Sequence, residues 1–137
     1  MTTGSRKFFL NLAVKDLNVS VAFFTKLGFT FDKRFTDESA TCMIVNDGAC
    51  VMLLVDEKFK GFTSKSLCDT TTNIEGIFAL SAESRDEVDR ITDIALAQGG
   101  TPAEEPQDHG FMYGRSFQDP DGHVWDLFWM DPGAFGG

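Results

Sequence analysis

The stretch 7-KFFLNLAVKDLNVSVAFFTKLGF-29 predicts a strand, a helix and a helix stop in immediate succession. FFLNLAV is a short apolar run, typical of a strand, although Asn11 lies inside it. Asp16 is suited to cap the start of a helix, and apolar residues then recur at helical spacing as far as Leu27. Gly28 follows the last of them, as a helix terminator does.

Residues 75–100, EGIFALSAESRDEVDRITDIALAQGG, repeat this order. IFALSA is a second apolar strand candidate. Ser84 and Glu87 have the spacing of a capping box at the start of a helix. The paired glycines Gly99 and Gly100 then end the helical pattern.

Further strand candidates follow each predicted helix, and each set contains an Asp-Gly turn. The first set is 29-FTFDKRF-35, 41-TCMIVND-47 and 49-ACVMLLV-55. The second is 111-FMYGRSFQD-119 and 123-HVWDLFWM-130, after a loop broken by prolines. The sequence therefore predicts a single α+β domain of two βαβββ repeats, about 6–60 and 74–131, joined by the polar linker 61–73.

Composition narrows the class of protein. The chain has 137 residues, which suits one domain, and its 14 phenylalanines favour a core or cavity with flat apolar surface. Its 12 basic and 21 acidic residues give a net charge of -9. That charge argues against binding to nucleic acid or to an anionic membrane surface.

The cysteines and the apolar runs indicate the cell compartment in which we expect the protein. The three cysteines are widely spaced without a CxxC pair, which argues against a disulfide framework or a structural zinc site. The N-terminal stretch lacks the apolar core of a signal peptide, and no run reaches the length of a membrane span. We therefore expect a reduced, cytoplasmic protein.

The two ends of the repeat pattern resemble a known family. LNLAVKDLNVSVAFFTKLGF is similar to the opening of vicinal oxygen chelate proteins, the family of glyoxalase I, extradiol dioxygenases, fosfomycin-resistance enzymes and bleomycin-binding proteins. FMYGRSFQDPDGHVWDLFWMDP resembles their closing strand, so the resemblance extends from about Phe8 to Pro132. It implies two modules that form a curved mixed sheet around a cavity, and a homodimer. It does not identify a reaction.

Members of this family that are enzymes bind one divalent metal through four strand positions. Two lie seven residues before the helix caps, and two lie four residues after the turn glycines. In this sequence those positions are Phe9, Met52, Ile77 and Asp126. One carboxylate, one thioether and two hydrocarbons do not hold a hard divalent ion, so the resemblance implies a member without the family's metal or any other cofactor.

The two histidines are the other candidate ligands for such a site. His123 lies three positions from Asp126 on a strand, so the two side chains point to opposite faces. We interpret His123 as a partly exposed hairpin residue. His109 lies in the loop before the penultimate strand, where it could reach the mouth of the cavity and share a metal with Asp126, although a lone loop histidine is more often exposed.

Asp126 is therefore a polar side chain in a predicted cavity that is otherwise mostly apolar, a composition typical of small-molecule pockets. It could bind a ligand's cation or hydrogen-bond donor, act as a general acid or base, or be structural through Arg115, Arg34 or a backbone donor. A buried carboxylate needs a partner, so we expect one for Asp126.

Tyr113 and Arg115 alternate on one strand and could both lie on the face that lines the pocket, although Arg115 could equally be a surface residue. The candidate ligand-binding residues are Phe9, Asn11, Met52, Ile77, Ser81, Tyr113, Arg115, Asp126 and Phe128.

Two hypotheses for the function follow from these residues and from the resemblance. The first is a metal-independent protein that binds a small aromatic or cationic organic molecule, as in bleomycin resistance. The second is a metal-dependent lyase or dioxygenase, of the lactoylglutathione lyase or extradiol dioxygenase type, with an unconventional metal site. The catalytic residues of such an enzyme are not identified by the sequence.

Overall fold

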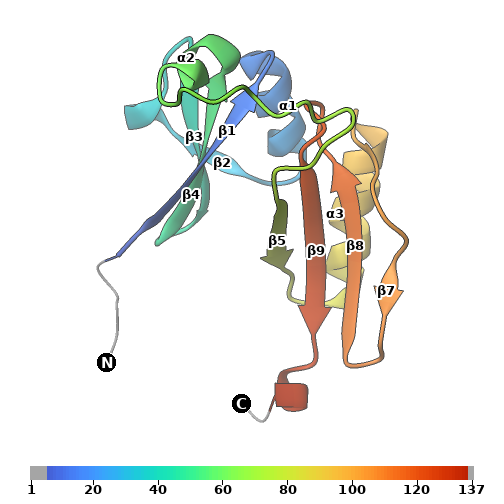
Figure 1. Ribbon diagram of the computed structural model, residues 1–137. Helices are drawn as coiled ribbons and strands as arrows, with labels where there is room; N and C mark the ends of the chain where they lie inside the picture. Colours follow the sequence, from blue (N-terminus) through green and yellow to red (C-terminus); the bar gives the residue numbers. More distant parts are fainter. Residues whose placement is uncertain (1–5, 136–137) are drawn as a thin grey trace. The chain divides into compact units, whose positions relative to one another are not determined.

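The computed structural model describes residues 6–135, and the chain divides into two compact units, Met1–Leu67 and Cys68–Gly137 (Figure 1). The division falls inside the predicted linker, and residues 68–73 belong with the second unit. Among the described residues, no helix is long and apolar enough to cross a membrane.

Unit 1 is a four-stranded mixed sheet with two helices. Its elements are β1 (Phe8–Val14), α1 (Leu17–Lys26), β2 (Thr30–Asp32), the 3-10 turn η1 (Lys33–Phe35), β3 (Ala40–Asn46), β4 (Ala49–Val55) and α2 (Asp56–Lys60). The strand order is β1-β4-β3-β2, with β1 parallel to β4 and the other pairs antiparallel. The short helix α2 was not predicted.

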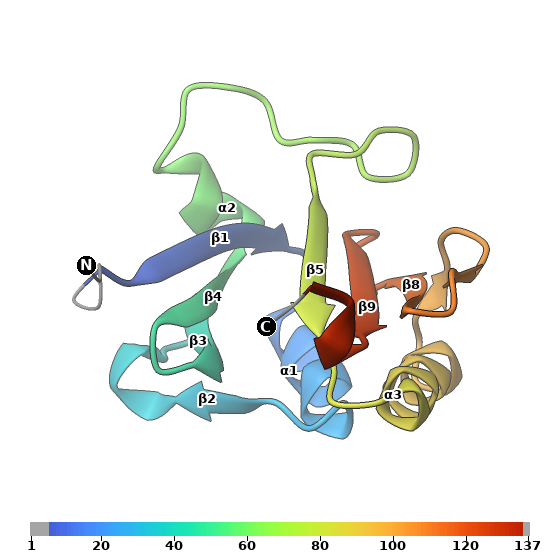
Figure 2. The same ribbon diagram turned by 90° about the horizontal axis from the view of Figure 1, so that it is seen from below.

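Unit 2 repeats this plan with a five-stranded sheet. Its elements are β5 (Ile77–Ser81), α3 (Arg85–Ala97), β6 (Thr101–Pro102), β7 (Gln107–Asp108), β8 (Met112–Gln118), β9 (Val124–Met130) and the 3-10 turn η2 (Pro132–Phe135). The order is β5-β9-β8-β6, with β7 also paired to β8, and β5 runs parallel to β9. Helix α3 packs on β8 and β9 (Figure 2). The predicted α+β fold of two βαβββ modules is confirmed.

The helices begin where the sequence predicts. Asp16 accepts hydrogen bonds from the backbone N–H groups of Asn18 and Val19 at 3.0 and 3.3 Å. Ser84 accepts one from the N–H of Glu87 at 3.0 Å, and the Glu87 carboxylate accepts one from the N–H of Glu83 at 2.8 Å. Each cap satisfies amide donors that the first helical turn cannot pair internally.

Each sheet has one face packed with large buried side chains. In unit 1 these are Leu12, Val14, Met43, Val51 and Leu53, together with Phe23 and Phe24 of α1. In unit 2 they are Phe117, Trp125 and Leu127, together with Val88 and Ala95 of α3. We call the side of the unit 1 sheet that packs against α1 the α1 face, and the side of the unit 2 sheet that packs against α3 the α3 face. The opposite side of each sheet is its second face. Because side chains alternate along a strand, the second faces carry the predicted family metal positions.

Candidate functional site

The second face of unit 2 carries Asp126 among small and apolar neighbours. Asp126 on β9 lies opposite Ala79 of β5 and Ser116 of β8. Two residues along the same face, Phe128 lies opposite Ser81, and in the other direction Val124 lies opposite Ile77. The strand register therefore brings Ile77, Ser81, Asp126 and Phe128 onto one face, as the alternation of side chains predicts.

The carboxylate of Asp126 has no hydrogen-bond or ion-pair partner among residues 6–135, so the partner that we expected is not found there. Asp126 is only half-buried, and water can reach its oxygens, which removes the need for a protein donor. Burial raises the pKa of this carboxyl above its ordinary value. A Cβ built on Gly114 would lie 3.7 Å from Asp126 Oδ1, so the glycine leaves the carboxylate uncovered on that side.

The second face of unit 1 carries Phe9, Asn11 and Met52, and it is mostly carbon and sulfur. Asn11 lies opposite Met52 in the β1–β4 register. Phe9 is 53% exposed, and its carbonyl accepts a 3.5 Å hydrogen bond from the Asn11 amide. At one end of this face, a hollow of about 350 Å³ is lined partly by Phe9, Cys42 and Cys50.

A divalent metal of the family's kind does not fit these residues. Three of the four family positions, Phe9, Met52 and Ile77, offer no oxygen or nitrogen donor. Within the described chain, no three side chains of His, Cys, Asp and Glu lie close enough together to hold an ion. His109 is exposed beside Phe111, with the two rings 6.3 Å apart. The donor chemistry of both second faces is therefore unsuited to a hard cation.

Tyr113 and Arg115 lie on the α3 face, so the expectation that they share a face with Asp126 is wrong. The Tyr113 hydroxyl donates to Asp89 of α3, and Arg115 donates to Asp89 and Asp93, each at 3.0 Å. The pKa of Asp89 is lowered, first by the hydrogen bond from Tyr113 and also by Arg115. Tyr113 and Arg115 therefore do share a face with each other. That face is the one that α3 covers, and there the two side chains link the helix to the sheet.

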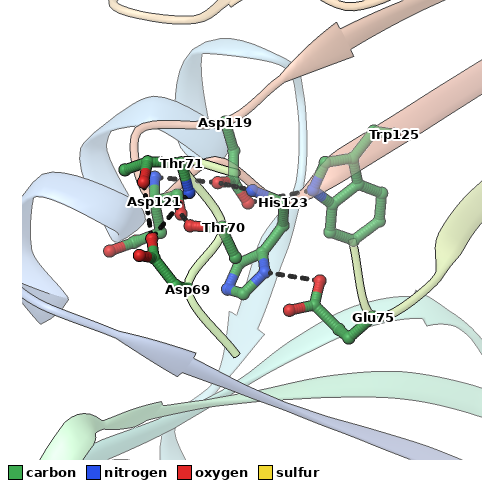
Figure 3. A network of polar contacts seen from close by, with 8 residues as sticks. All are labelled: Asp69, Thr70, Thr71, Glu75, Asp119, Asp121, His123 and Trp125. Atoms are coloured by element: carbon green, nitrogen blue, oxygen red, sulfur yellow. Dashed lines mark hydrogen bonds and ion pairs between the residues drawn. The ribbon is translucent and has the colours of Figure 1, made fainter. Parts of the chain in front are cut away.

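Sequence reasoning missed the buried polar network that holds the β8–β9 turn (Figure 3). Asp119, only 5% exposed, accepts hydrogen bonds from the indole N–H of Trp125 at 2.9 Å and from two backbone N–H groups. Those two belong to Asp121 and His123, at 2.9 and 3.1 Å. Burial raises the pKa of Asp119 above its ordinary value, although these hydrogen bonds act in the opposite direction and lower it. The Asp-Pro-Asp-Gly sequence is typical of an Asx turn, and that signal could have identified Asp119.

His123 belongs to the same network and is buried, so the prediction of a partly exposed histidine is wrong. Its ring Nδ1 lies 3.1 Å from Glu75 Oε1, and the ring meets Phe78 edge-on with centroids 6.4 Å apart. The hydroxyl of Thr70 donates to the carbonyl of Asp121 in the turn. These contacts bring residues 69–75 over the turn. This cover explains why His123, which lies next to a hairpin turn, is buried from solvent.

Comparisons with known proteins agree with this architecture. The family described as Glyoxalase/Bleomycin resistance protein/Dioxygenase superfamily matches residues 8–127. A hypothetical protein, SA1046, from S. aureus is 27% identical, with 94% of each chain covered and a TM-score of 0.76. The fosfomycin resistance protein FosX from Listeria monocytogenes is 24% identical, with 94% of each chain covered and a TM-score of 0.64. A glyoxalase-related enzyme from Fulvimarina pelagi is 17% identical, with 90% of this chain and 87% of that one covered and a TM-score of 0.77. A comparison with curated proteins found no match.

Proposed function

Because the chain belongs to the Glyoxalase/Bleomycin resistance protein/Dioxygenase superfamily, we propose that it binds a small organic cation through Asp126, without the divalent metal of the family's enzymes. The ligand class is a flat aromatic molecule with a positively charged or hydrogen-bond-donating group. Binding, rather than turnover, is the activity that these residues support.

The carboxylate of Asp126 is the observation that carries this proposal. It is a half-buried anion with no donor from residues 6–135, on a sheet face that is mostly apolar apart from Ser81 and Ser116. Such an acceptor gains a charge-assisted hydrogen bond when a ligand brings a cationic N–H group to it. Phe128, half-buried, and Ile77, 64% exposed, offer flat and apolar contact beside it. The net charge of -9 also favours the approach of a cation over that of an anion.

A matched pair of probes tests this proposal. 9-Aminoacridine is a flat aromatic cation at neutral pH, and acridine has the same ring system without the charge. We expect 9-aminoacridine to raise the melting temperature and bind measurably in calorimetry, and acridine to bind more weakly. Asp126→Asn should weaken 9-aminoacridine binding by about 1–3 kcal/mol, the scale of a hydrogen bond to a charged group.

The control is Asp86→Asn, which removes one exposed carboxylate from α3 and leaves Asp126 intact. It should bind 9-aminoacridine as the wild-type protein does. Equal binding by the wild-type protein and Asp126→Asn, or no binding by either, would overturn the role of Asp126.

Elemental analysis tests the metal part of the proposal separately. Protein purified without a metal-affinity tag is incubated with Zn, Ni, Mn, Co or Fe(II) salts, exchanged into buffer and analysed. We expect no tightly retained ion, and no difference between the wild-type protein and Asp126→Ala. An ion retained in wild-type protein and lost in Asp126→Ala would support the lyase or dioxygenase hypothesis instead.

We also propose a cytoplasmic homodimer. Large apolar side chains stand exposed in both units, among them Phe8 (63%) and Ile77 (64%), which is typical of a surface that a partner covers. The three cysteines are free, which suits a reducing compartment. Light scattering coupled to size-exclusion chromatography would test the dimer, since a mass of one chain at micromolar concentration would contradict it.

A further inference from the structure

Three sulfur atoms of unit 1 share the second face of its sheet. Cys42 of β3 lies directly opposite Met52 of β4, and Cys50 lies two residues before Met52 on the same strand. Because side chains alternate along a strand, all three project to the same side. Ile44, which lies opposite Cys50, completes the four-residue patch. Strands β3 and β4 are consecutive and hydrogen-bonded neighbours (Figure 1).

The two thiols are close together and almost inaccessible to bulk water. Cys42 is 4% exposed and Cys50 is 9% exposed, and neither forms a disulfide. Burial, followed by the hydrogen bond with Cys42, raises the pKa of the Cys50 thiol to about 11. Cys50 is therefore a protonated thiol at neutral pH that shares a hydrogen bond with Cys42, and Met52 lies half-buried beside them.

The two cysteines border a hollow in unit 1. Cys42 and Cys50 both line the hollow of about 350 Å³ at this end of the sheet, so the two residues border a space that a small ion can enter. Its walls also include Phe9 and four charged residues, Lys7, Asp32, Arg34 and Asp47, and Arg34 forms an ion pair with Asp32 at 2.8 Å. The formal charges on these walls therefore balance, and the rest of the wall is mainly apolar.

A disulfide is a poor use of this pair. Cys42 and Cys50 are diagonal neighbours rather than directly opposed residues, and diagonal Cα atoms lie about 7–8 Å apart in a sheet. A disulfide needs Cα atoms within about 4.4–6.8 Å. The pair is better suited to two sulfurs bridged by a third atom than to two sulfurs bonded to each other.

We propose that Cys42, Cys50 and Met52 form a binding site for a soft monovalent cation of the Cu(I) type. Thiolate and thioether sulfur are the ligands that Cu(I) prefers, whereas hard divalent ions prefer oxygen. On binding, each thiol loses its proton to the buffer and its sulfur binds the ion, while Met52 donates a thioether lone pair. No electron is transferred, and the bis-thiolate complex has a charge of minus one.

Anaerobic titration with Cu(I), in competition with the chromogenic chelator bathocuproine disulfonate, tests this site. The background is Cys68→Ser, because Cys68 is exposed and is absent from the cluster. We expect about one Cu(I) per chain to be withdrawn from the chelator, with an ultraviolet sulfur-to-copper charge-transfer band. Ag(I) should also bind, at about one ion per chain. Affinity should rise with pH, because the two thiols release protons when the ion binds.

Substitutions separate the cluster from incidental sulfur. Cys42→Ala and Cys50→Ala should each abolish competition with the chelator, and circular dichroism shows whether each variant is folded. Met52→Leu nearly conserves volume and should weaken binding without abolishing it. The matched control is Met43→Leu, which removes a sulfur from the same strand pair but on the α1 face, and it should bind Cu(I) as the background does.

Two results would overturn the proposal. One is a folded Cys68→Ser protein that withdraws no Cu(I) from the chelator. The other is equal binding by the background and by a folded Cys50→Ala variant, which would locate the ion elsewhere. Asp126→Asn should leave Cu(I) binding unchanged, since Asp126 belongs to the other unit. Failure of the organic-cation proposal and failure of this one are therefore distinguishable.

Discussion

The two Asp-Gly hairpins have the same sequence signature and different structural roles. In unit 1, Asn46 is exposed and accepts one hydrogen bond, from the N–H of Gly48 at 2.8 Å. In unit 2, Asp119 is buried and accepts from a tryptophan and from two backbone groups. A repeated motif therefore predicts a repeated turn, but it does not predict how much of the fold depends on that turn.

The two long helices differ in a similar way. Helix α1 is held by apolar packing, since Phe23 and Phe24 are 2% and 1% exposed and meet edge-on. Helix α3 is also tied to its sheet by charge, through Asp89 and Asp93 on Arg115. The first kind of contact is insensitive to salt, whereas the second is weakened by it.

Replacing Phe24 with alanine should give the largest effect. Phe24 is fully buried, so Phe24→Ala should lower the free energy of unfolding by about 3–5 kcal/mol. Its counterpart on α3, Asp89→Ala, should lower it by only about 1 kcal/mol, because a partly exposed ion pair is weak. Urea denaturation followed by far-ultraviolet circular dichroism measures both. Similar losses in the two variants would break the contrast between the helices.

The contrast between the hairpins is tested by Asp119→Ala, which leaves the Trp125 indole and two backbone N–H groups without their acceptor. We expect a loss of about 3 kcal/mol, since each buried donor without a partner is destabilising. Asn46→Ala, at the exposed turn, should change stability by about 0.5 kcal/mol or less. Both tryptophans are in unit 2, so their fluorescence during denaturation reports that unit.

The turn glycines sharpen the same comparison. Gly122 has φ of +81°, and a Cβ there would lie 2.7 Å from the Thr70 hydroxyl. Gly122→Ala should therefore destabilise by about 2 kcal/mol. Gly48 lacks a positive φ, and the nearest atom to a Cβ there is 3.8 Å away, so Gly48→Ala should have little effect. Thermal unfolding of the two variants distinguishes them, and an equal drop in both melting temperatures would contradict this account.

The smallest expected effect is a gain of stability. Burial raises the pKa of Asp126, so the folded state favours its protonated form. The stabilisation from that proton is complete below the unfolded pKa and is lost as pH rises through the folded pKa. At pH 7, Asp126→Asn should therefore be more stable than wild type by about 1 kcal/mol, the low end of the cost of an unpaired buried polar group.

Urea denaturation of the wild type and of Asp126→Asn between pH 3 and pH 7 tests the sign. The difference should shrink as pH falls towards 3. A difference that grows at low pH would mean that the folded state favours the charged carboxylate, and a donor for Asp126 would then have to exist.

The sequence was sufficient for the fold because its signals are local. Caps at Asp16 and Ser84, helix stops and alternating strands all depend on residues a few positions apart, and all formed as expected. The sites were harder to predict. Alternation shows that Tyr113 and Arg115 share a face, but it does not show which face the helix covers. The burial of His123 depends on Glu75, which lies 48 residues away in sequence.

The same limits apply to the second faces. Alternation along one strand is enough to put Cys50 and Met52 on one face, whereas adding Cys42 requires the register between β3 and β4. The expectation of a partner for Asp126 assumed full burial, but a half-buried carboxylate can remain hydrated.

The contacts of Thr70 with Asp121, and of Glu75 with His123, determine where the gene could be divided to produce the second repeat by itself. A half-gene that starts at residue 76 would begin just before β5 and would look complete by strand boundaries. It would nevertheless discard the residues that close over the β8–β9 turn and would leave the ring of His123 open to water. A half-gene that starts at residue 68 retains them. The useful boundary for recombination or for fragment expression therefore lies several residues before the first strand of the repeat.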